Sequence, residues 1–465
     1  MMTFTEYMAS MALPLPEQIR KLKDAGRLRD AERALDARLA MDLPVMLRHR
    51  LLTEKERLRR TRDDYPFDEQ QAFLELQKVY PELDEKTFRQ LDDEGLMDFL
   101  FFDGVKRYHV RFAATLRKDS LIKKRFGHPV DSGNDWLDSM IQTLRTEGTL
   151  SRRITLEAQI APSADVFRPG TWRAWLPVPL ESDQQSAFQV LSGQPDSIGD
   201  AHAPARSAYW ERESGTLPVF SLRYRYISTI RYADPLHAPV PACPLYPCAA
   251  PPCDEDLAED GVFIRFTPYL RALARTLTEG VTEPVEKAWR FYCFVTQKVR
   301  YAFVRQYFLL DDLGEYCALN LRGDCGLQAL LFIILCRISG IPARWQSGLS
   351  MDEDYTGAHD WAQFYLEGWG WLFADPSYGG SAWRCGAADR HAFYFGNIDP
   401  MRMAANRQFM APLTPQTHQF RHDPYDQQSG EIESPELDCA LLGKQIDDDV
   451  SMIGWETLPA EGNEG

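Results

Sequence analysis

The sequence predicts an α+β protein built from several structural units. Three observations lead to this prediction: the length of the chain, a change of hydrophobic period along it, and one long apolar helix followed by a β-hairpin. At 465 residues the chain exceeds a single typical core, so about three folded units are expected. We divide the chain into a helical module 1–148, a β-rich domain 149–240, a linker 241–258, a third domain 259–422 and an acidic tail 423–465.

The first unit is predicted to be helical. Apolar residues recur at helical spacing on both sides of Gly26, which predicts two short helices in a hairpin: Ile19 and Leu22, then Leu28, Ala31, Leu35 and Leu39. Apolar residues at 73–76 and 96–102 supply further faces of the module. No second copy follows at a fixed period, so a solenoid is not expected. The module could bind a protein partner, cover the third domain or mediate self-association, and the sequence does not decide among these roles.

The second unit changes to a hydrophobic period of two, which is typical of half-buried strands. Apolar and polar residues alternate over 154–160 and again over 220–226. The proline-rich linker that follows marks a domain boundary. Cys243, Cys248 and Cys253 recur there every five residues, but no CxxC pair is present, so a plain linker is favoured over a metal site. No metal ligand set is expected.

Charge is distributed unevenly along the chain, whose net charge is −16. The tail from Asp423 onward carries twelve acidic residues and one basic residue, Lys444, so the rest of the chain is close to balanced. This pattern lacks the basic footprint of a nucleic-acid-binding protein, and no nucleic-acid partner is expected. The tail itself is expected to be mobile.

The nine cysteines, an odd number, bear on the cellular compartment. The start of the chain has neither a basic region nor a continuous apolar stretch, and no transmembrane segment is recognisable. These features favour reduced thiols in a cytoplasmic protein that has no membrane partner.

One cysteine begins the most apolar helix of the sequence. Gly323 and Asp324 provide a turn and an N-cap, so Cys325 is expected on the first helical turn. An apolar stripe follows at helical spacing: Leu327, Leu330, Leu331, Ile334, Leu335 and Ile338. A thiol at this position faces unsatisfied N–H groups and the positive end of the helix macrodipole. With a histidine nearby, its pKa is expected to fall from about 8.5 to roughly 3.5–7.5.

A histidine and an aspartate frame the hairpin that is predicted next. A β-rich run at 361–366 and a return strand at 371–373 flank a Gly-Trp-Gly turn. His359 enters the first strand and Asp375 leaves the second, which can bring the two side chains together. A thiol, an imidazole and a carboxylate in this order are the parts of an activated cysteine nucleophile.

These motifs resemble those of the transglutaminase-like superfamily of cysteine enzymes. The resemblance covers about 282–380 and rests on Gly-Asp-Cys, Gly-Ile-Pro-Ala-Arg, His-Asp-Trp, Gly-Trp-Gly-Trp and Asp-Pro-Ser in this order. It implies a papain-like core with Cys325 as nucleophile, His359 as base and Asp375 as orienting acid. The family often shows His-Ala-Trp where this chain has His-Asp-Trp. The Trp-Leu-Pro-Val-Pro run at 175–179 resembles a strand end of the β-sandwich that precedes this core in many bacterial relatives.

Four further residues are candidates for the site. Papain-like enzymes add a side-chain donor to the oxyanion hole from the segment before the nucleophile, where Gln306 has suitable chemistry. Tyr307 from the same segment and Trp361 are candidates for substrate binding. Arg402 could bind a substrate carboxylate, since a guanidinium forms bidentate pairs with this group, and a structural ion pair is the alternative.

The reaction that the resemblance implies is acyl transfer through a thioester. We expect hydrolysis of a peptide or amide bond, because bacterial members with this domain order resemble proteases and amidases. The alternatives are crosslinking or deamidation of protein glutamine, and a catalytically silent fold that binds a partner. No EF-hand calcium loop appears, and the paired CxxC zinc ligands of peptide-N-glycanases are missing, so no cofactor is expected.

Overall fold

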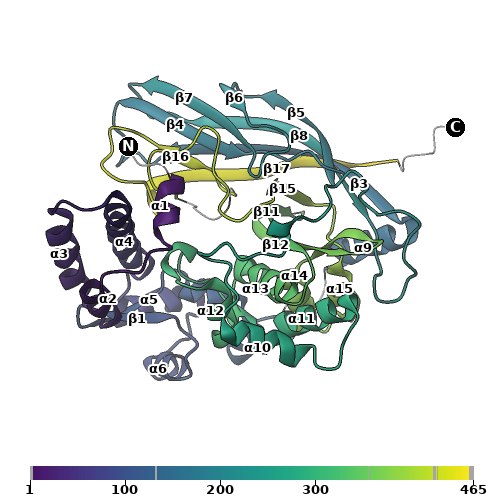
Figure 1. Ribbon diagram of the computed structural model, residues 1–465, viewed down its shortest axis with the longest axis horizontal. Coiled ribbons are helices and arrows are strands. Elements are labelled where there is room, and N and C mark those ends of the chain that lie inside the picture. Colours follow the sequence, from purple (N-terminus) through teal and green to yellow (C-terminus); the bar gives the residue numbers. More distant parts are fainter. Residues whose placement is uncertain (1–3, 131–133, 354, 423–425, 427, 460–465) are drawn as a thin grey trace.

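The computed structural model describes residues 4–130, 134–353, 355–422, 426 and 428–459. Helices and sheets occupy different parts of the molecule, with the longest strands on one side and most helices on the other (Figure 1). The predicted α+β class is confirmed. Within the described residues no helix combines the length and the apolar character needed to cross a bilayer.

The first unit is helical, as predicted, but it also contains a β-hairpin. Its elements are α1 (Phe4–Ser10), α2 (Glu17–Asp24), α3 (Leu28–Leu39), α4 (Val45–Asp64), α5 (Glu69–Val79), α6 (Glu85–Asp93), β1 (Phe99–Phe102), β2 (Val105–Tyr108), α7 (Phe112–Lys118), α8 (Ser120–Arg125) and α9 (Asp135–Glu147). The hairpin of α2 and α3 was predicted. The helical interpretation of residues 96–102 is wrong, because Asp103 and Gly104 both adopt positive φ and close a two-residue turn between β1 and β2.

The second unit is a pair of antiparallel sheets, each with four strands among the described residues. One sheet has the order β16-β4-β7-β6 and the other β17-β3-β8-β5. Their bounds are β3 (Thr149–Pro162), β4 (Gly170–Pro177), β5 (Gln185–Ser192), β6 (Ser197–Ile198), β7 (Ser207–Ser214), β8 (Phe220–Arg231), β16 (Glu431–Glu433) and β17 (Ile446–Leu458). Alternate residues of β8 are buried from Phe220 onward, which is the predicted period of two.

The strands β16 and β17 come from the segment that was expected to be a mobile acidic tail. That expectation is wrong for these residues, since β17 pairs with β3 from Ile446 opposite Pro162 to Leu458 opposite Ser151. Three consecutive acidic residues at 447–449 interrupt the alternation of apolar and polar residues by which a strand is predicted from sequence. The pairing of this strand depends instead on backbone hydrogen bonds to β3. Charged residues on a strand at the edge of a sheet also discourage pairing with other chains.

The third domain is built around a five-stranded antiparallel sheet with the order β14-β13-β12-β11-β15. The bounds of its elements are α10 (Pro268–Leu277), α11 (Pro284–Lys298), β9 (Arg300–Tyr301), α12 (Leu313–Asn320), β10 (Arg322–Gly323), α13 (Cys325–Ile338), β11 (Ala343–Met351), β12 (Thr356–Leu366), β13 (Gly370–Ala374), α14 (Pro376–Cys385), α15 (Ala388–Phe393), β14 (Phe395–Gly396) and β15 (Arg402–Asn406).

Helix α13 is the centre of this domain. It packs on β11 and β12 on one side and on α10, α11, α12 and α14 on the others (Figure 1). Every residue from Gly326 to Cys336 is buried, so the helix is apolar all round and not only along the predicted stripe. A helix enclosed in this way fixes the position of its first residue, Cys325, relative to the sheet.

The helical module covers part of the third domain, one of the three roles that the sequence left open. Helix α4 supplies the contact: Arg57 donates to the carbonyl of Phe308 at 2.8 Å and Arg60 donates to Gln306 Oε1 at 2.9 Å. Helix α7 adds Thr115, whose hydroxyl accepts the backbone N–H of Phe303 at 3.0 Å. The segment 303–308, just before the predicted nucleophile, is therefore held by the first unit.

Candidate active site

Cys325 lies at the start of α13, where the sequence predicted it. Asp324 is the N-cap, and its carboxylate accepts the backbone N–H of Leu327 at 3.2 Å. The same carboxylate accepts a hydrogen bond from the hydroxyl of Tyr307, whose ring lies against Gly326. A side chain at Gly326 would collide with that ring, so glycine is required for the close approach. Tyr307 thus holds the carboxylate of the N-cap residue Asp324, next to the thiol of Cys325.

His359 and Asp375 meet as the predicted hairpin requires. Strands β12 and β13 pair in antiparallel register, and Asp375 follows β13 as the N-cap of α14. Its Oδ1 accepts the backbone N–H of Tyr378 at 2.9 Å, while Oδ2 accepts His359 Nε2–H at 2.8 Å. Because this bond fixes the proton of neutral imidazole on Nε2, Nδ1 is the basic nitrogen.

Arg402 supports this pair from within the core. Its guanidinium contacts Asp375 Oδ2 at 3.0 Å and Asp399 Oδ2 at 2.8 Å, and the side chain is fully buried. The predicted role in binding a substrate carboxylate is therefore wrong, and the structural ion pair is the alternative found. Burial raises the pKa of Asp375, but His359 and Arg402 outweigh it and hold that pKa below the ordinary value.

The environment of the thiol differs from the prediction. Cys325 Sγ donates to Asp360 Oδ2 at 3.3 Å. Burial, reinforced by the negative charges of Asp360 and Asp324, raises the pKa of Cys325 well above its ordinary value. Burial also lowers the pKa of His359, although Asp375 opposes this. The expected lowering of the thiol pKa is wrong for this state, which holds a neutral thiol and a neutral imidazole near pH 7.

Asp360 is the residue of this site that sequence reasoning missed. Its second oxygen accepts a hydrogen bond from Gln428 Nε2 at 2.5 Å, so it joins the thiol to the segment before β16. The available signal was the departure from His-Ala-Trp to His-Asp-Trp, since the extra carboxylate falls beside the nucleophile. Gln428 carried no local signal, because it is 68 residues away from Asp360 in the sequence.

Cys325, His359 and Asp360 open into one cavity of about 690 Å³. Its walls come from α7, the segment 301–307, β12, α14 and residues 426, 428 and 429. Gln306 and Tyr307 also line it, but the amide of Gln306 is already bonded to Arg60 and to Asp64 Oδ1. An oxyanion role for Gln306 stays a prediction.

Trp361 does not contribute to this cavity. Its side chain is fully buried in the core of the third domain, and its indole N–H donates to Gln346 Oε1 at 2.6 Å. The predicted substrate-binding role is wrong, because the Trp361 side chain is enclosed in the packed interior of the domain.

Residues 271–376 match the family model of the transglutaminase-like superfamily. This part of the chain is a transglutaminase-like domain. The match runs from within α10 to the first residue of α14 and therefore includes Cys325, His359 and Asp375.

Solved structures similar to the chain include a candidate cysteine protease from Cytophaga hutchinsonii. It has 13% sequence identity and a TM-score of 0.39, and the similarity covers 67% of this chain and 92% of that chain. The periplasmic domain of TgpA from Pseudomonas aeruginosa has 16% identity and a TM-score of 0.28, covering 55% and 94% respectively. At these TM-scores neither similarity supports an inference about function. No curated protein matches the chain.

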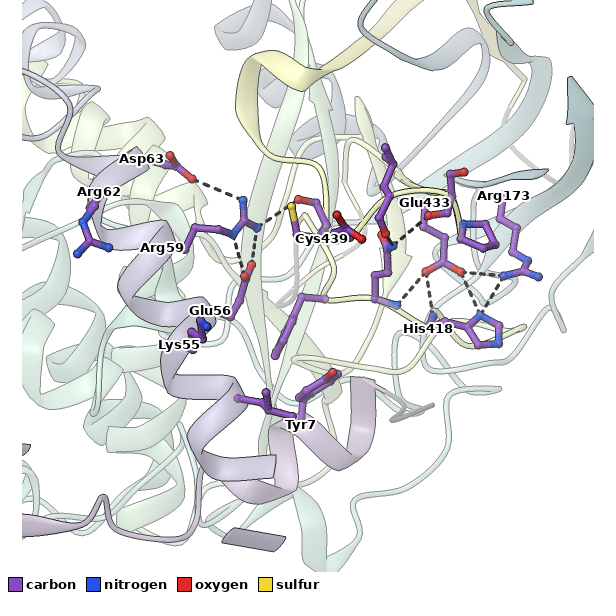
Figure 2. A pocket seen from close by; sticks show the side chains of 18 of the residues that line it. Tyr7, Lys55, Glu56, Arg59, Arg62, Asp63, Arg173, His418, Glu433 and Cys439 are labelled. Carbon is purple, nitrogen blue, oxygen red and sulfur yellow. Dashed lines mark hydrogen bonds and ion pairs between the residues drawn. The ribbon is translucent and has the colours of Figure 1, made fainter. Parts of the chain in front are cut away.

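A second large cavity lies away from the candidate residues of the transglutaminase-like domain. It has a volume of about 780 Å³, and its lining includes parts of α1 and α4 and residues 418–420, 433–435 and 437–440 (Figure 2). Figure 2 shows that several of its charged side chains are paired, as Arg59 with Glu56 at 2.7 Å and His418 with Glu433 at 3.1 Å.

Metal-ligating side chains do not gather in the described part of the chain in groups of three or more. Cys243, Cys248 and Cys253 are exposed free thiols in the segment that precedes the transglutaminase-like domain. This segment contacts the domain through backbone groups, as where the N–H of Leu245 donates to the carbonyl of Trp369 at 3.2 Å.

Proposed function

We propose that the protein is a cysteine hydrolase that cleaves peptide or amide bonds through Cys325, His359 and Asp375. The observation that carries the proposal is the 2.8 Å bond from His359 to Asp375, at the wall of the cavity into which Cys325 opens. A base that is oriented by a buried carboxylate and lines the same cavity as a helix-terminal cysteine supplies the groups that thiol acyl transfer needs.

In the first half-reaction, the thiol proton passes to Nδ1 of His359 as Sγ attacks the amide carbonyl carbon. The tetrahedral oxyanion is bound by the backbone N–H of Cys325, and Gln306 is the predicted second donor. His359 then returns the proton to the leaving amine, and a thioester remains. Asp375 holds the imidazolium in place during both transfers.

In the second half-reaction, water attacks the thioester carbonyl while Nδ1 of His359 takes its proton. Collapse of the second tetrahedral intermediate releases the carboxylic acid and restores the thiol. Because the thiol is neutral in the resting state, the thiolate forms only when substrate enters and breaks the hydrogen bond that Cys325 Sγ donates to Asp360. A cytoplasmic location, which keeps all nine thiols reduced, belongs to the same proposal.

One observation favours a second candidate, a catalytically silent domain that binds a partner. The raised pKa of Cys325 is what an inert buried cysteine would also show. Slow alkylation of the resting thiol therefore does not distinguish an enzyme from a silent fold, and turnover has to decide.

The test is mass spectrometry of a diverse peptide pool after incubation with wild type or Cys325→Ala, with and without a primary amine. Shortened peptides that require Cys325 are the expected result. A mass gain that depends on the amine would replace hydrolysis with transglutamination. If wild type and Cys325→Ala give identical pools, the hydrolase proposal fails and the silent alternative replaces it.

A further inference from the structure

A basic groove extends the cavity around Cys325. It is a second hollow of about 600 Å³ whose cationic lining is Arg117, Lys118, Lys123, Arg300 and Arg384. The two hollows share five lining residues: Arg117, Lys118, Tyr301, Ser377 and Tyr378. A substrate peptide bound across Cys325 can therefore extend directly into the basic groove.

The cations of the groove exceed its carboxylates. Among the residues that the structure describes, two acidic ones line it, Asp119 and Asp352. Asp119 is already paired with Arg300 and caps α8. Arg117, Lys118 and Arg384 lie within ion-pairing distance of no carboxylate among the described residues. Such an excess is notable in a chain whose net charge is −16.

Lys118 and Arg384 are exposed side chains whose pKa values are nonetheless lowered. The Lys118 amine lies 4.9 Å from the ring centre of Tyr301 and 5.0 Å from that of Phe303. Partial desolvation lowers the pKa of Lys118, and the neighbouring cations Arg111 and Arg117 add to the lowering. Desolvation likewise lowers the pKa of Arg384. An anion in the groove would offset the free-energy cost of keeping Lys118 and Arg384 charged.

We propose that the basic groove binds carboxylates of the substrate beside the bond that Cys325 attacks, so that acidic peptide segments are the substrate class. This inference rests on the proposed function for its chemistry. The cations stand on four separate elements, α7, α8, β9 and α14, among hydroxyls of Ser377, Ser381 and Tyr378. Because these cations are separated, with hydroxyl donors between them, they can pair with carboxylate side chains that are spaced along an extended peptide.

The charge on the rest of the molecule favours short acidic segments over long polyanions. A nucleic acid would extend beyond the groove and meet the field of a protein with net charge −16. A peptide segment confined to the groove meets mainly cations, and their field raises its local concentration at the site.

The experiment uses three series of fluorogenic peptides that are identical except at every second residue, which is Glu, Gln or Lys. Wild type is expected to cleave the Glu series with kcat/KM about tenfold above the Gln series, and the preference should weaken in 0.5 M NaCl. Lys118→Gln with Arg384→Gln should reduce the preference to about twofold or less. Lys118→Glu should favour the Lys series.

The matched control is Lys86→Gln, which removes one exposed cation from α6, outside both hollows. It should keep the full preference for the Glu series. Equal cleavage of all three series by wild type, with cleavage still dependent on Cys325, would overturn this inference and leave the proposed function intact.

If no series is cleaved, the proposed function is in doubt and binding decides the inference separately. Fluorescence anisotropy of the same peptides with Cys325→Ala should then show tighter binding of the Glu series, lost in the Lys118 and Arg384 double variant. Equal binding of the three series would overturn the inference.

Discussion

Asp360 lies between the thiol of Cys325 and the amide of Gln428, so this one carboxylate influences the charge of the candidate nucleophile. Its position on β12, directly after His359, means that the base and the residue opposing ionisation come from adjacent positions of the same strand. The helix N-terminus favours the thiolate, while burial and two nearby carboxylates oppose it. In the resting state the effects that oppose ionisation are larger, so the pKa of Cys325 is raised.

Asp360→Ala tests this balance. Removing the carboxylate should lower the pKa of Cys325, because one negative charge and one acceptor for the thiol proton disappear. We expect the pH profile of iodoacetamide alkylation at Cys325, followed by peptide mass spectrometry, to shift down by about one unit or more. At pH 7 the rate should rise about tenfold.

The control for this variant is Asp93→Ala, which removes an exposed carboxylate at the end of α6. Its alkylation profile should match that of wild type. An unchanged profile in Asp360→Ala would mean that burial alone sets the charge of the thiol.

Asp375→Asn tests the orientation of the imidazole. An amide N–H in place of Oδ2 cannot accept the proton of His359 Nε2, so the ring adopts the other tautomer and Nδ1 loses its lone pair for the thiol proton. We expect kcat to fall by roughly 10²–10⁴-fold. The loss should be smaller than in His359→Ala, which has no base at all. A larger loss in Asp375→Asn than in His359→Ala would mean that the two roles are misassigned.

At the scale of elements, α4 joins the helical module to the transglutaminase-like domain through buried charges. Arg60 donates to Glu56 at 2.8 Å, to Gln306 at 2.9 Å and to the carbonyl of Arg421 at 2.7 Å. It thereby connects three parts of the chain that lie far apart in sequence. A buried ion pair of this kind adds little net stability, but losing Arg60 removes a buried donor from Gln306 and from the carbonyl of Arg421, while Glu56 keeps Arg59.

Arg60→Met keeps the length of the side chain and removes its charge. We expect it to lower the free energy of unfolding by about 3–5 kcal/mol, measured by urea denaturation, because Glu56 and two acceptors lose a buried donor. Arg59→Met is the matched control, since Arg59 also pairs with Glu56 but its side chain is 31% exposed. Its effect should stay near 1 kcal/mol. Equal effects of the two substitutions would contradict a role for Arg60 in docking the module.

At the scale of the whole molecule, stability depends on pH through buried groups that act in opposite directions. Burial lowers the pKa of His391 to about 4, so the unfolded chain binds a proton more readily than the folded one between about pH 6.5 and 4. Stability from this group is therefore lost as pH falls through that window. Burial raises the pKa of Asp64 and Asp324 to about 6, which has the opposite sign.

His391→Gln isolates one of these groups. The glutamine removes a titrating ring that hydrogen bonds to Thr296 at 2.9 Å, and it lowers stability at every pH. Between pH 7 and pH 5, however, the variant should lose less stability than wild type, by about 1–2 kcal/mol. Parallel pH profiles of the urea midpoint for the two proteins would contradict the lowered pKa of His391.

The features that sequence reasoning predicted depend on short stretches of chain. The N-cap at Asp324, the helix that follows it and the hairpin joining His359 to Asp375 are each encoded within about twenty residues, and all three are present. The alternation of apolar and polar residues, which is also a local signal, predicted the β-rich second unit. Asp103-Gly104 was also a local turn signal, and the hairpin of β1 and β2 could have been predicted from it.

The features that were missed depend on contacts between distant residues. The roles of Arg402 and Trp361 are set by burial, which their own neighbours in sequence do not reveal. The raised pKa of Cys325 arises from side chains that tertiary structure places beside it. Strand β17 finds its partner about 300 residues earlier in the chain, beyond the range of any local pattern.

The pairing of β17 with β3 has a consequence for biosynthesis. Strand β8 ends at Arg231 and β17 begins at Ile446, so the transglutaminase-like domain is an insertion between strands of one sandwich. A ribosome adding 5–20 residues per second needs roughly 10–40 s to make the intervening segment. Throughout that time the outer edge of β3 is exposed on the nascent chain, open to pairing with another copy. The enclosed cysteine domain can fold first, and the sandwich is completed only when the last strand leaves the ribosome.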